Sequence, residues 1–218
     1  GLSTGDAIRV LEEEAATALP PGYAYEWTGT AQQQLASSGL VGLILSMAVI
    51  FGYLFLVAQY ESWTMPVGIL LSVTVALFGA LAAVAIVGSD VNLYTQIGMI
   101  MLIGLASKNA ILIVEFAMER RASGMSTAES ALEAARQRFR AVMMTALSFL
   151  LGVIPLLVAS GAGAASQKAI GVAVFGGMLA ATLLGVIIVP VLYVIMQSLR
   201  ERVKAIGRKE ESQPPSAA

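Results

Sequence analysis

Long apolar segments occupy most of the chain from residue 39 to residue 197 and limit what it can fold into. A helix needs about 20 mostly apolar residues to cross the hydrocarbon core of a bilayer. Because the bilayer core offers no water, the backbone must pair its own polar groups there, which favours helices. We therefore predict an all-α polytopic membrane domain over 39–197, with transmembrane helices at 39–59, 65–87, 93–117, 141–160 and 169–197.

The composition agrees with a membrane protein. The chain is 57% hydrophobic and 12% charged, whereas soluble domains carry about 25% charged residues. It contains no cysteine and no histidine. These absences argue against disulfides, most zinc sites and nucleophiles paired with histidine. We expect no metal, no cofactor and no nucleic-acid partner.

The residues before the first transmembrane helix look like part of a soluble domain. Apolar positions recur at helical spacing over 4–19, the Pro20-Pro21-Gly22 sequence ends that helix, and 23–28 reads as a strand. One helix and one strand cannot bury a core. We therefore interpret 1–38 as a small α/β remnant of a larger domain together with a lead-in. The first residue is Gly1 rather than methionine, which we take as a sign of a fragment or a split half.

The polar links and small residues add further detail. Ser126 followed by Glu129 forms a capping-box sequence, so we predict a short surface helix at 126–137. Residues 198–218 are expected to be a largely disordered cytoplasmic tail. Two prolines, Pro155 and Pro190, should kink their helices. Small residues permit close helix contact; they include Gly79, Ala83, Gly104, Gly171, Gly176 and Gly177.

Basic residues predict the orientation, since loops rich in lysine and arginine remain in the cytoplasm. One predicted side carries only Arg9 and Lys168. The other side carries Arg120, Arg121, Arg136, Arg138, Arg140, Arg200, Arg202, Lys204, Arg208 and Lys209. We therefore expect the N-terminal region to face outward, which in a bacterium is the periplasm, and the tail to face the cytoplasm.

Lys108 lies inside the third predicted transmembrane helix, about 14 Å from its cytoplasmic end. A lysine at the bilayer centre costs about 2.5 to 3.5 kcal/mol on insertion scales, and such residues usually mark ion or proton paths. A purely structural buried ion pair is the alternative. Both interpretations need a carboxylate, and the predicted spans supply none at that depth. We therefore predict either that the partner of Lys108 lies on another helix or that Lys108 is uncharged part of the time.

Other polar groups accompany Lys108. Asn109 follows it, and Glu115 shares its helical stripe about 10 Å further along. Thr145 enters the next predicted transmembrane helix at a depth similar to that of Glu115, so a water-lined route to Lys108 is conceivable.

Each of these groups also has a structural interpretation. The Thr145 hydroxyl can bond its own helix backbone. Glu115 can mark the end of its helix and face water, the interpretation that we favour. Arg138 and Arg140 can act as simple topology anchors.

Several sequence stretches resemble resistance-nodulation-division (RND) multidrug efflux transporters. Residues 104–117 (Gly-Leu-Ala-Ser-Lys-Asn-Ala-Ile-Leu-Ile-Val-Glu-Phe-Ala) resemble their tenth transmembrane helix. Residues 60–63 (Tyr-Glu-Ser-Trp) resemble the link between the eighth and ninth helices. Residues 138–145 (Arg-Phe-Arg-Ala-Val-Met-Met-Thr) resemble the start of the eleventh helix, and 161–171 the following loop. The hydrophobe/amphiphile branch fits better than the heavy-metal branch.

The resemblance implies a pump of twelve transmembrane helices, of which this chain is the last five, preceded by the end of a periplasmic porter domain. Such pumps are homotrimers in the bacterial inner membrane. They work with a periplasmic adaptor protein and an outer-membrane channel, and a proton gradient rather than a cofactor drives export. By resemblance the chain is therefore part of a proton antiporter and not an enzyme.

The resemblance also implies roles for particular residues. Lys108 matches the lysine that pairs with two aspartates on the fourth helix. Asn109, Thr145 and Arg138 match other members of the proton relay. Ala141 replaces a proline found in many relatives.

Alternative functions remain at this point. One is a related lipid-export or protein-export membrane domain, and another is a purely structural half whose lysine holds helices together. An intramembrane protease is disfavoured, because the predicted spans contain no aspartate and the chain has no histidine.

Overall fold

The computed structural model describes residues 4–38, 40–161 and 163–211. Its helices are α1 (Thr4–Ala18), α2 (Gly29–Ser38), α3 (Val41–Tyr60), α4 (Met65–Val87), α5 (Leu93–Ala122), α6 (Thr127–Leu157) and α7 (Ala164–Glu211). The five helices from α3 to α7 are long and apolar enough to cross a membrane. The prediction of five transmembrane helices is confirmed.

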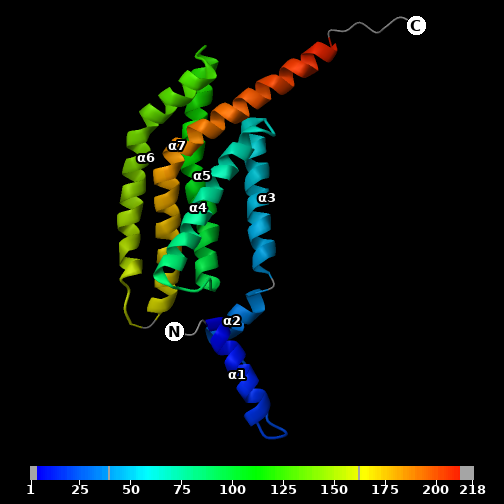
Figure 1. The fold of residues 1–218 in the computed structure, drawn as a ribbon, viewed down its shortest axis with the longest axis vertical. Helices are drawn as coiled ribbons and strands as arrows, with labels where there is room; N and C mark the ends of the chain where they lie inside the picture. The colour runs from blue at the N-terminus through cyan, green and yellow to red at the C-terminus, as the bar shows by residue number, and fades with distance from the viewer. Residues whose placement is uncertain (1–3, 39, 162, 212–218) are drawn as a thin grey trace, which may run out of the picture.

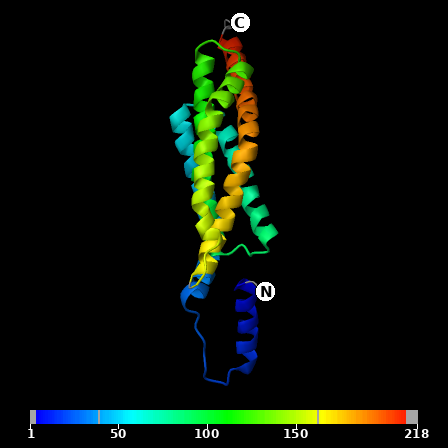
Figure 2. The same ribbon diagram turned by 90° about the vertical axis from the view of Figure 1, so that its left-hand side faces the viewer.

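Helix α7 is the centre of the bundle and contacts α4, α5 and α6 (Figure 1). Helix α3 stands at the side, against α4 and α5. Only 6% of its apolar window is buried inside the chain, compared with 39% for α5. Helix α1 lies at the opposite end of the bundle from the last turns of α7 (Figure 2). Helix α3 is apolar on all sides but largely uncovered, so it is suited to contact with lipid or with further helices.

Glycines bring α4 and α7 into very close contact. A Cβ atom added to Gly79 would lie 2.8 Å from the carbonyl oxygen of Gly176, and one added to Gly176 would lie 2.9 Å from that of Gly79. Side chains at these positions would therefore push the backbones apart. Gly104 differs from this pattern, because a Cβ atom there meets nothing within 4 Å.

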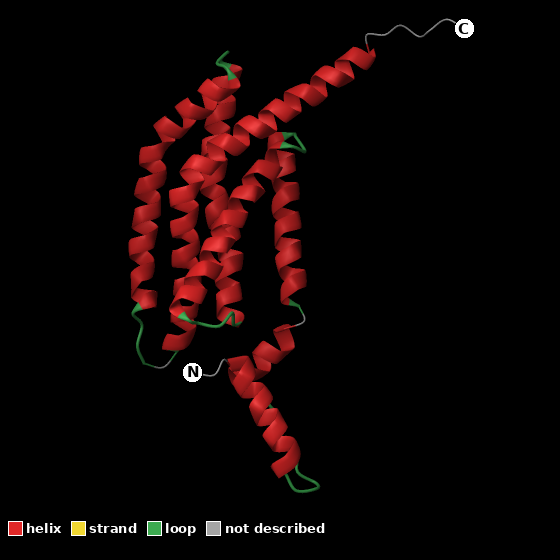
Figure 3. Ribbon diagram, in the orientation of Figure 1, coloured by secondary structure: helices red, strands yellow, loops and turns green. Residues whose placement is uncertain are grey.

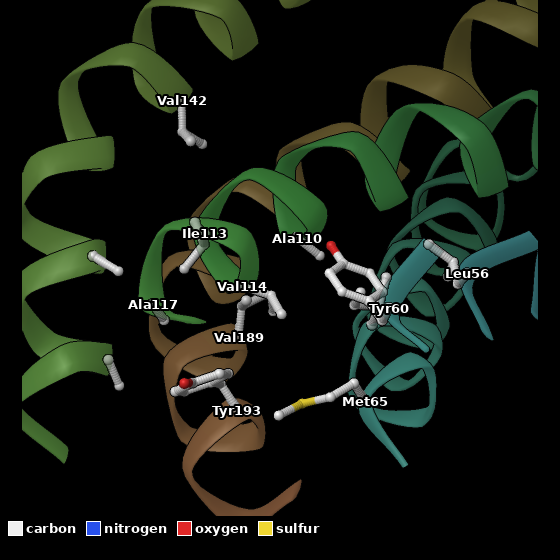
Figure 4. Close-up of a cluster of buried hydrophobic side chains, with 13 residues drawn as sticks. Leu56, Tyr60, Met65, Ala110, Ile113, Val114, Ala117, Val142, Val189 and Tyr193 are labelled. Carbon is white, nitrogen blue, oxygen red and sulfur yellow. The ribbon is translucent and has the colours of Figure 1, made fainter. Parts of the chain in front are cut away.

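A buried cluster fills the bundle near the α3–α4 link (Figure 4). Met65 and Tyr193 are each 2% exposed, and Tyr60 closes the cluster at the end of α3. Ala117 of α5 and Ala134 of α6 belong to the same cluster. The cluster therefore joins all five long helices at this end and holds α5 in place.

The predicted strand at 23–28 was wrong. The described residues contain helices and loops without a strand (Figure 3). A strand needs a neighbour to pair its backbone groups, and the described chain offers none here. Instead the Trp27 indole N–H donates to Glu12 Oε1 at 3.0 Å, which folds the segment back on α1. The expected α/β remnant is helical, and it includes the unpredicted helix α2.

The predicted surface helix at 126–137 and the following transmembrane helix form one continuous helix, α6. The capping box is present: the Ser126 side chain accepts from the Glu129 N–H, and Glu129 accepts from the Ser126 N–H at 3.2 Å. The residues at 138–140 include no glycine or proline, so nothing interrupts the helix before the bilayer. The polar stretch at 126–137 therefore has different surroundings from the transmembrane part of α6, but the helix continues through both.

Helix α7 likewise runs beyond its predicted end at 197. It continues to Glu211, so the tail expected to be disordered from 198 is helical up to that residue. Arginine, glutamate, lysine and alanine dominate 200–205, and these are good helix formers. Residues 212–218 of the predicted tail lie outside the described residues. Pro190 is accommodated inside α7, as Pro155 is inside α6.

A disulfide would test the α4–α7 contact. A Cβ atom at Gly68 lies 3.8 Å from the Leu192 Cβ, close to the mean disulfide value of about 3.8 Å. Because the chain has no cysteine, we expect the double variant Gly68→Cys/Leu192→Cys to form a disulfide on oxidation. Protection of both thiols from a maleimide reagent is the measurement. The pair Gly52→Cys/Leu192→Cys is the control, since a Cβ at Gly52 meets nothing within 4 Å. Equal labelling of the two pairs would contradict the packing.

Candidate functional site

One stripe along α5 is left uncovered by the other helices of the chain. Its exposed members, at helical spacing, are Ile97, Met101, Gly104, Lys108 and Glu115. Lys108 therefore projects from the middle of a transmembrane helix onto an outer surface of the bundle. In a bilayer that surface is covered by hydrocarbon or by another helix, and only another helix can supply a polar partner.

Lys108 has no ion pair within the described part of the chain. The ion pairs there join Arg9 to Asp6 and Glu13 within α1, and Arg121 to Glu201. The geometry is consistent with a carboxylate partner that comes from outside these helices. That partner stays a prediction.

Glu115 is exposed at the far end of the same stripe. It borders an open cleft of about 270 Å³ together with Gln59, Tyr60, Glu61 and Met118. Gln59, Tyr60 and Glu61 belong to the end of α3 and its link to α4, and Met118 belongs to α5. The exposure of Glu115 fits the interpretation that it faces water, but the expectation that it marks a helix end was wrong, because α5 continues to Ala122.

Thr145 is exposed on α6, and its hydroxyl donates to the carbonyl oxygens of Ala141 at 3.1 Å and Val142 at 3.0 Å. Bonding to the helix's own backbone is the structural interpretation considered for this residue. The described residues show no hydrogen bond between Thr145 and Lys108. A relay role would require the hydroxyl to leave its own helix.

Asn109 lies beside Lys108 in the sequence but faces a different environment. Neighbouring residues of an α-helix are about 100° apart, so Asn109 points into the bundle, where it is 9% exposed. Its Nδ2 atom has no hydrogen-bond partner among the described residues. Asn109 and Lys108 therefore do not form one polar cluster in this structure.

Arg138 is half-buried and stacks on an aromatic ring of the neighbouring helix. Its guanidinium carbon lies 4.6 Å from the centroid of Phe116, and that of Arg120 lies 5.0 Å from the same centroid. Arg120 also donates to Gln137 Oε1 at 3.1 Å. The ring attracts both cations through its quadrupole and connects α5 to α6 at the basic end of the bundle. Arg140 is exposed.

Sequence reasoning missed two of these contacts. The only signal for Phe116 was its spacing of four residues from Arg120, which places both on one helix face. The second contact joins Arg121 to Glu201 at 2.9 Å, with Gln197 donating to the same carboxylate at 2.8 Å. That ion pair connects residues 80 positions apart, so no local pattern could indicate it.

Similarity to known proteins identifies the family of this chain. The sequence model of the AcrB/AcrD/AcrF family matches residues 1–197. The chain belongs to the AcrB/AcrD/AcrF family. This result confirms the resemblance to RND multidrug efflux transporters.

Named members of the AcrB/AcrD/AcrF family are similar over nearly the whole chain. The toluene efflux pump membrane transporter TtgB of Pseudomonas putida is 44% identical over 91% of this chain and 19% of its own length. The multidrug resistance protein MdtF of Escherichia coli is 42% identical over 94% of this chain and 20% of its own length. The multidrug export protein AcrF of the same species is 40% identical over 90% of this chain and 19% of its own length. The chain thus spans about a fifth of the length of these relatives.

A double-mutant cycle would test the stacked arginines. We expect Phe116→Leu to lower the free energy of unfolding by about 1 to 2 kcal/mol, through the lost ring contacts. Its coupling to Arg138→Met should be about 0.5 to 1 kcal/mol, because the pair is only partly desolvated. Denaturation in detergent is the measurement. Phe139→Leu, at a phenylalanine that is 51% exposed, is the control. Purely additive effects at Phe116 and Arg138 would refute the stacking.

Proposed function

We propose that this chain is the C-terminal membrane portion of a proton-driven multidrug or amphiphile efflux pump. The observation that carries the proposal is Lys108, which is exposed in mid-span without an ion pair in the described chain. The names of the relatives support the substrate class, since they describe toluene efflux, multidrug resistance and multidrug export. The whole pump is a transporter rather than an enzyme.

The energetic argument concerns the uncovered stripe of α5. An ammonium group facing lipid costs about 2.5 to 3.5 kcal/mol at mid-depth. A carboxylate on an adjoining helix removes most of that cost, because it replaces hydrocarbon with a charged partner. We assign this position to the helix with paired aspartates that the family resemblance implies. When those carboxylates take up protons they lose their charge, and the ammonium moves to other partners.

The assembly follows from the same resemblance. The pump is a homotrimer in the bacterial inner membrane, and it contacts a periplasmic adaptor protein and an outer-membrane channel. The N-terminal region faces the periplasm and the end of α7 faces the cytoplasm. Basic residues support this orientation, because α5 ends with Arg120 and Arg121 on the side where α7 carries Arg200.

The four relay residues receive different support. Lys108 fits the role best because its surroundings leave it open to a partner. Thr145 is exposed but bonded to its own helix, and Arg138 lies at the basic end beside Phe116. Asn109 faces the interior of the bundle instead of the uncovered stripe.

Export by the assembled pump tests Lys108. We expect Lys108→Ala to abolish proton-driven export of a fluorescent amphiphile, because the relay loses its cation. Membrane insertion and trimer formation should survive, since Lys108 is not part of the buried core. Lys168→Ala, which removes an exposed lysine near the start of α7, is the matched control and should export normally. Normal export by Lys108→Ala would leave only the structural interpretation of this lysine.

A matched pair on α6 tests Thr145. Ser148 is also exposed there, and its hydroxyl donates to the Met144 carbonyl at 2.8 Å. If the Thr145 hydroxyl serves the relay, Thr145→Val lowers the export rate at least tenfold whereas Ser148→Ala leaves it unchanged. Initial rates of export under an imposed pH gradient are the measurement. Equal rates for the two variants would show that the hydroxyl of Thr145 satisfies its own backbone and does nothing more.

A further inference from the structure

A small cavity lies inside the bundle, where α4, α5, α6 and α7 meet. Its volume is about 10 Å³, roughly that of the smallest space able to hold one water molecule. Four of the labelled residues in Figure 4 line it: Ala110 and Ile113 from α5, Val142 from α6 and Val189 from α7. An apolar cavity of this size would stay empty, so the polar groups on its wall decide whether water enters.

The first polar group on the wall is the side-chain amide of Asn109. The residue is 9% exposed, and its Nδ2 atom is buried without a hydrogen-bond partner among the described residues. An amide N–H that leaves water without a new acceptor is costly, so buried amides are nearly always paired. The cavity is the space next to this side chain where an acceptor can be placed.

The second polar group is a backbone carbonyl of α7. Pro190 lies inside this helix and has no N–H to donate to the carbonyl four residues earlier, which belongs to Val186. Val186 also lines the cavity. A residue whose carbonyl lacks its helical donor therefore lines the same cavity as Asn109, whose amide lacks an acceptor.

A third group completes the polar wall. Ser72 of α4 lines the cavity and donates its hydroxyl hydrogen to the Ile69 carbonyl at 2.6 Å. That bond leaves the lone pairs of its oxygen able to accept. Buried waters in proteins make about three hydrogen bonds, usually to groups that have no other partner.

We propose that this cavity is a binding site for a single water molecule. The water accepts from the Asn109 amide and donates one hydrogen to the Val186 carbonyl and the other to the Ser72 hydroxyl oxygen. It connects α5, next to Lys108, with α4 and with the proline turn of α7. The inference does not rest on the proposed function, since it follows from the groups on the cavity wall.

Water-edited solid-state NMR of the protein in lipid bilayers tests this site. With ¹⁵N-labelled asparagine side chains, we expect magnetisation transfer from water to the Asn109 amide, identified as the signal that disappears in Asn109→Leu. Ser72→Ala should lower this transfer several-fold. Ser72 lines the cavity, and this variant removes the hydroxyl oxygen that accepts from the water.

Two further variants sharpen the result. Ser148→Ala is the matched control, because that serine is exposed on α6 and its hydroxyl also donates to a carbonyl of its own helix; transfer should be unchanged. Pro190→Ala gives the Val186 carbonyl a helical donor, so transfer should fall several-fold. An Asn109 amide that receives no magnetisation from water overturns the proposal. Transfer that persists unchanged in both Ser72→Ala and Pro190→Ala overturns it too.

Discussion

The free energy of a lysine in hydrocarbon is the constraint on which the interpretation of this bundle depends. Lys108 lies on the uncovered stripe of α5, and no carboxylate of the described chain forms an ion pair with it. Its insertion cost of about 2.5 to 3.5 kcal/mol is comparable to a large part of the stability of a small domain. We propose that the chain carries that charge as one side of an interface. The surface that is uncovered in the isolated chain is then the proposed functional surface of the molecule.

The rest of the bundle holds that surface in place. Close glycine contacts bring α4 against α7, and the cluster around Tyr193 joins these helices to α5. At the basic end, Phe116 lies between two guanidinium groups and Arg121 is paired with Glu201. These contacts fix the rotation of α5 about its axis. They turn Asn109 inward and Lys108 outward, so two adjacent polar residues have different surroundings.

The transmembrane helices could be predicted from the sequence because the bilayer imposes a length of about 20 apolar residues. The capping box at Ser126 could also be predicted, since its hydrogen bonds are local. The prediction of a strand at 23–28 was wrong, because backbone pairing needs a second strand and the described chain has none. The lengths of α5, α6 and α7 were underestimated because a helix crosses the membrane boundary without ending there. The ring contact of Arg138 and the burial of Asn109 are tertiary and had no sequence pattern of their own.

The most direct measurement is the distance from Lys108 Nζ to the nearest carboxylate oxygen in a structure of the pump assembled in a bilayer. The account predicts an ion pair, with a value below about 4 Å, to an aspartate on a helix other than α3 to α7. An Nζ atom surrounded by bulk water would contradict it. So would an Nζ atom whose hydrogen bonds all end on backbone carbonyls of these same five helices.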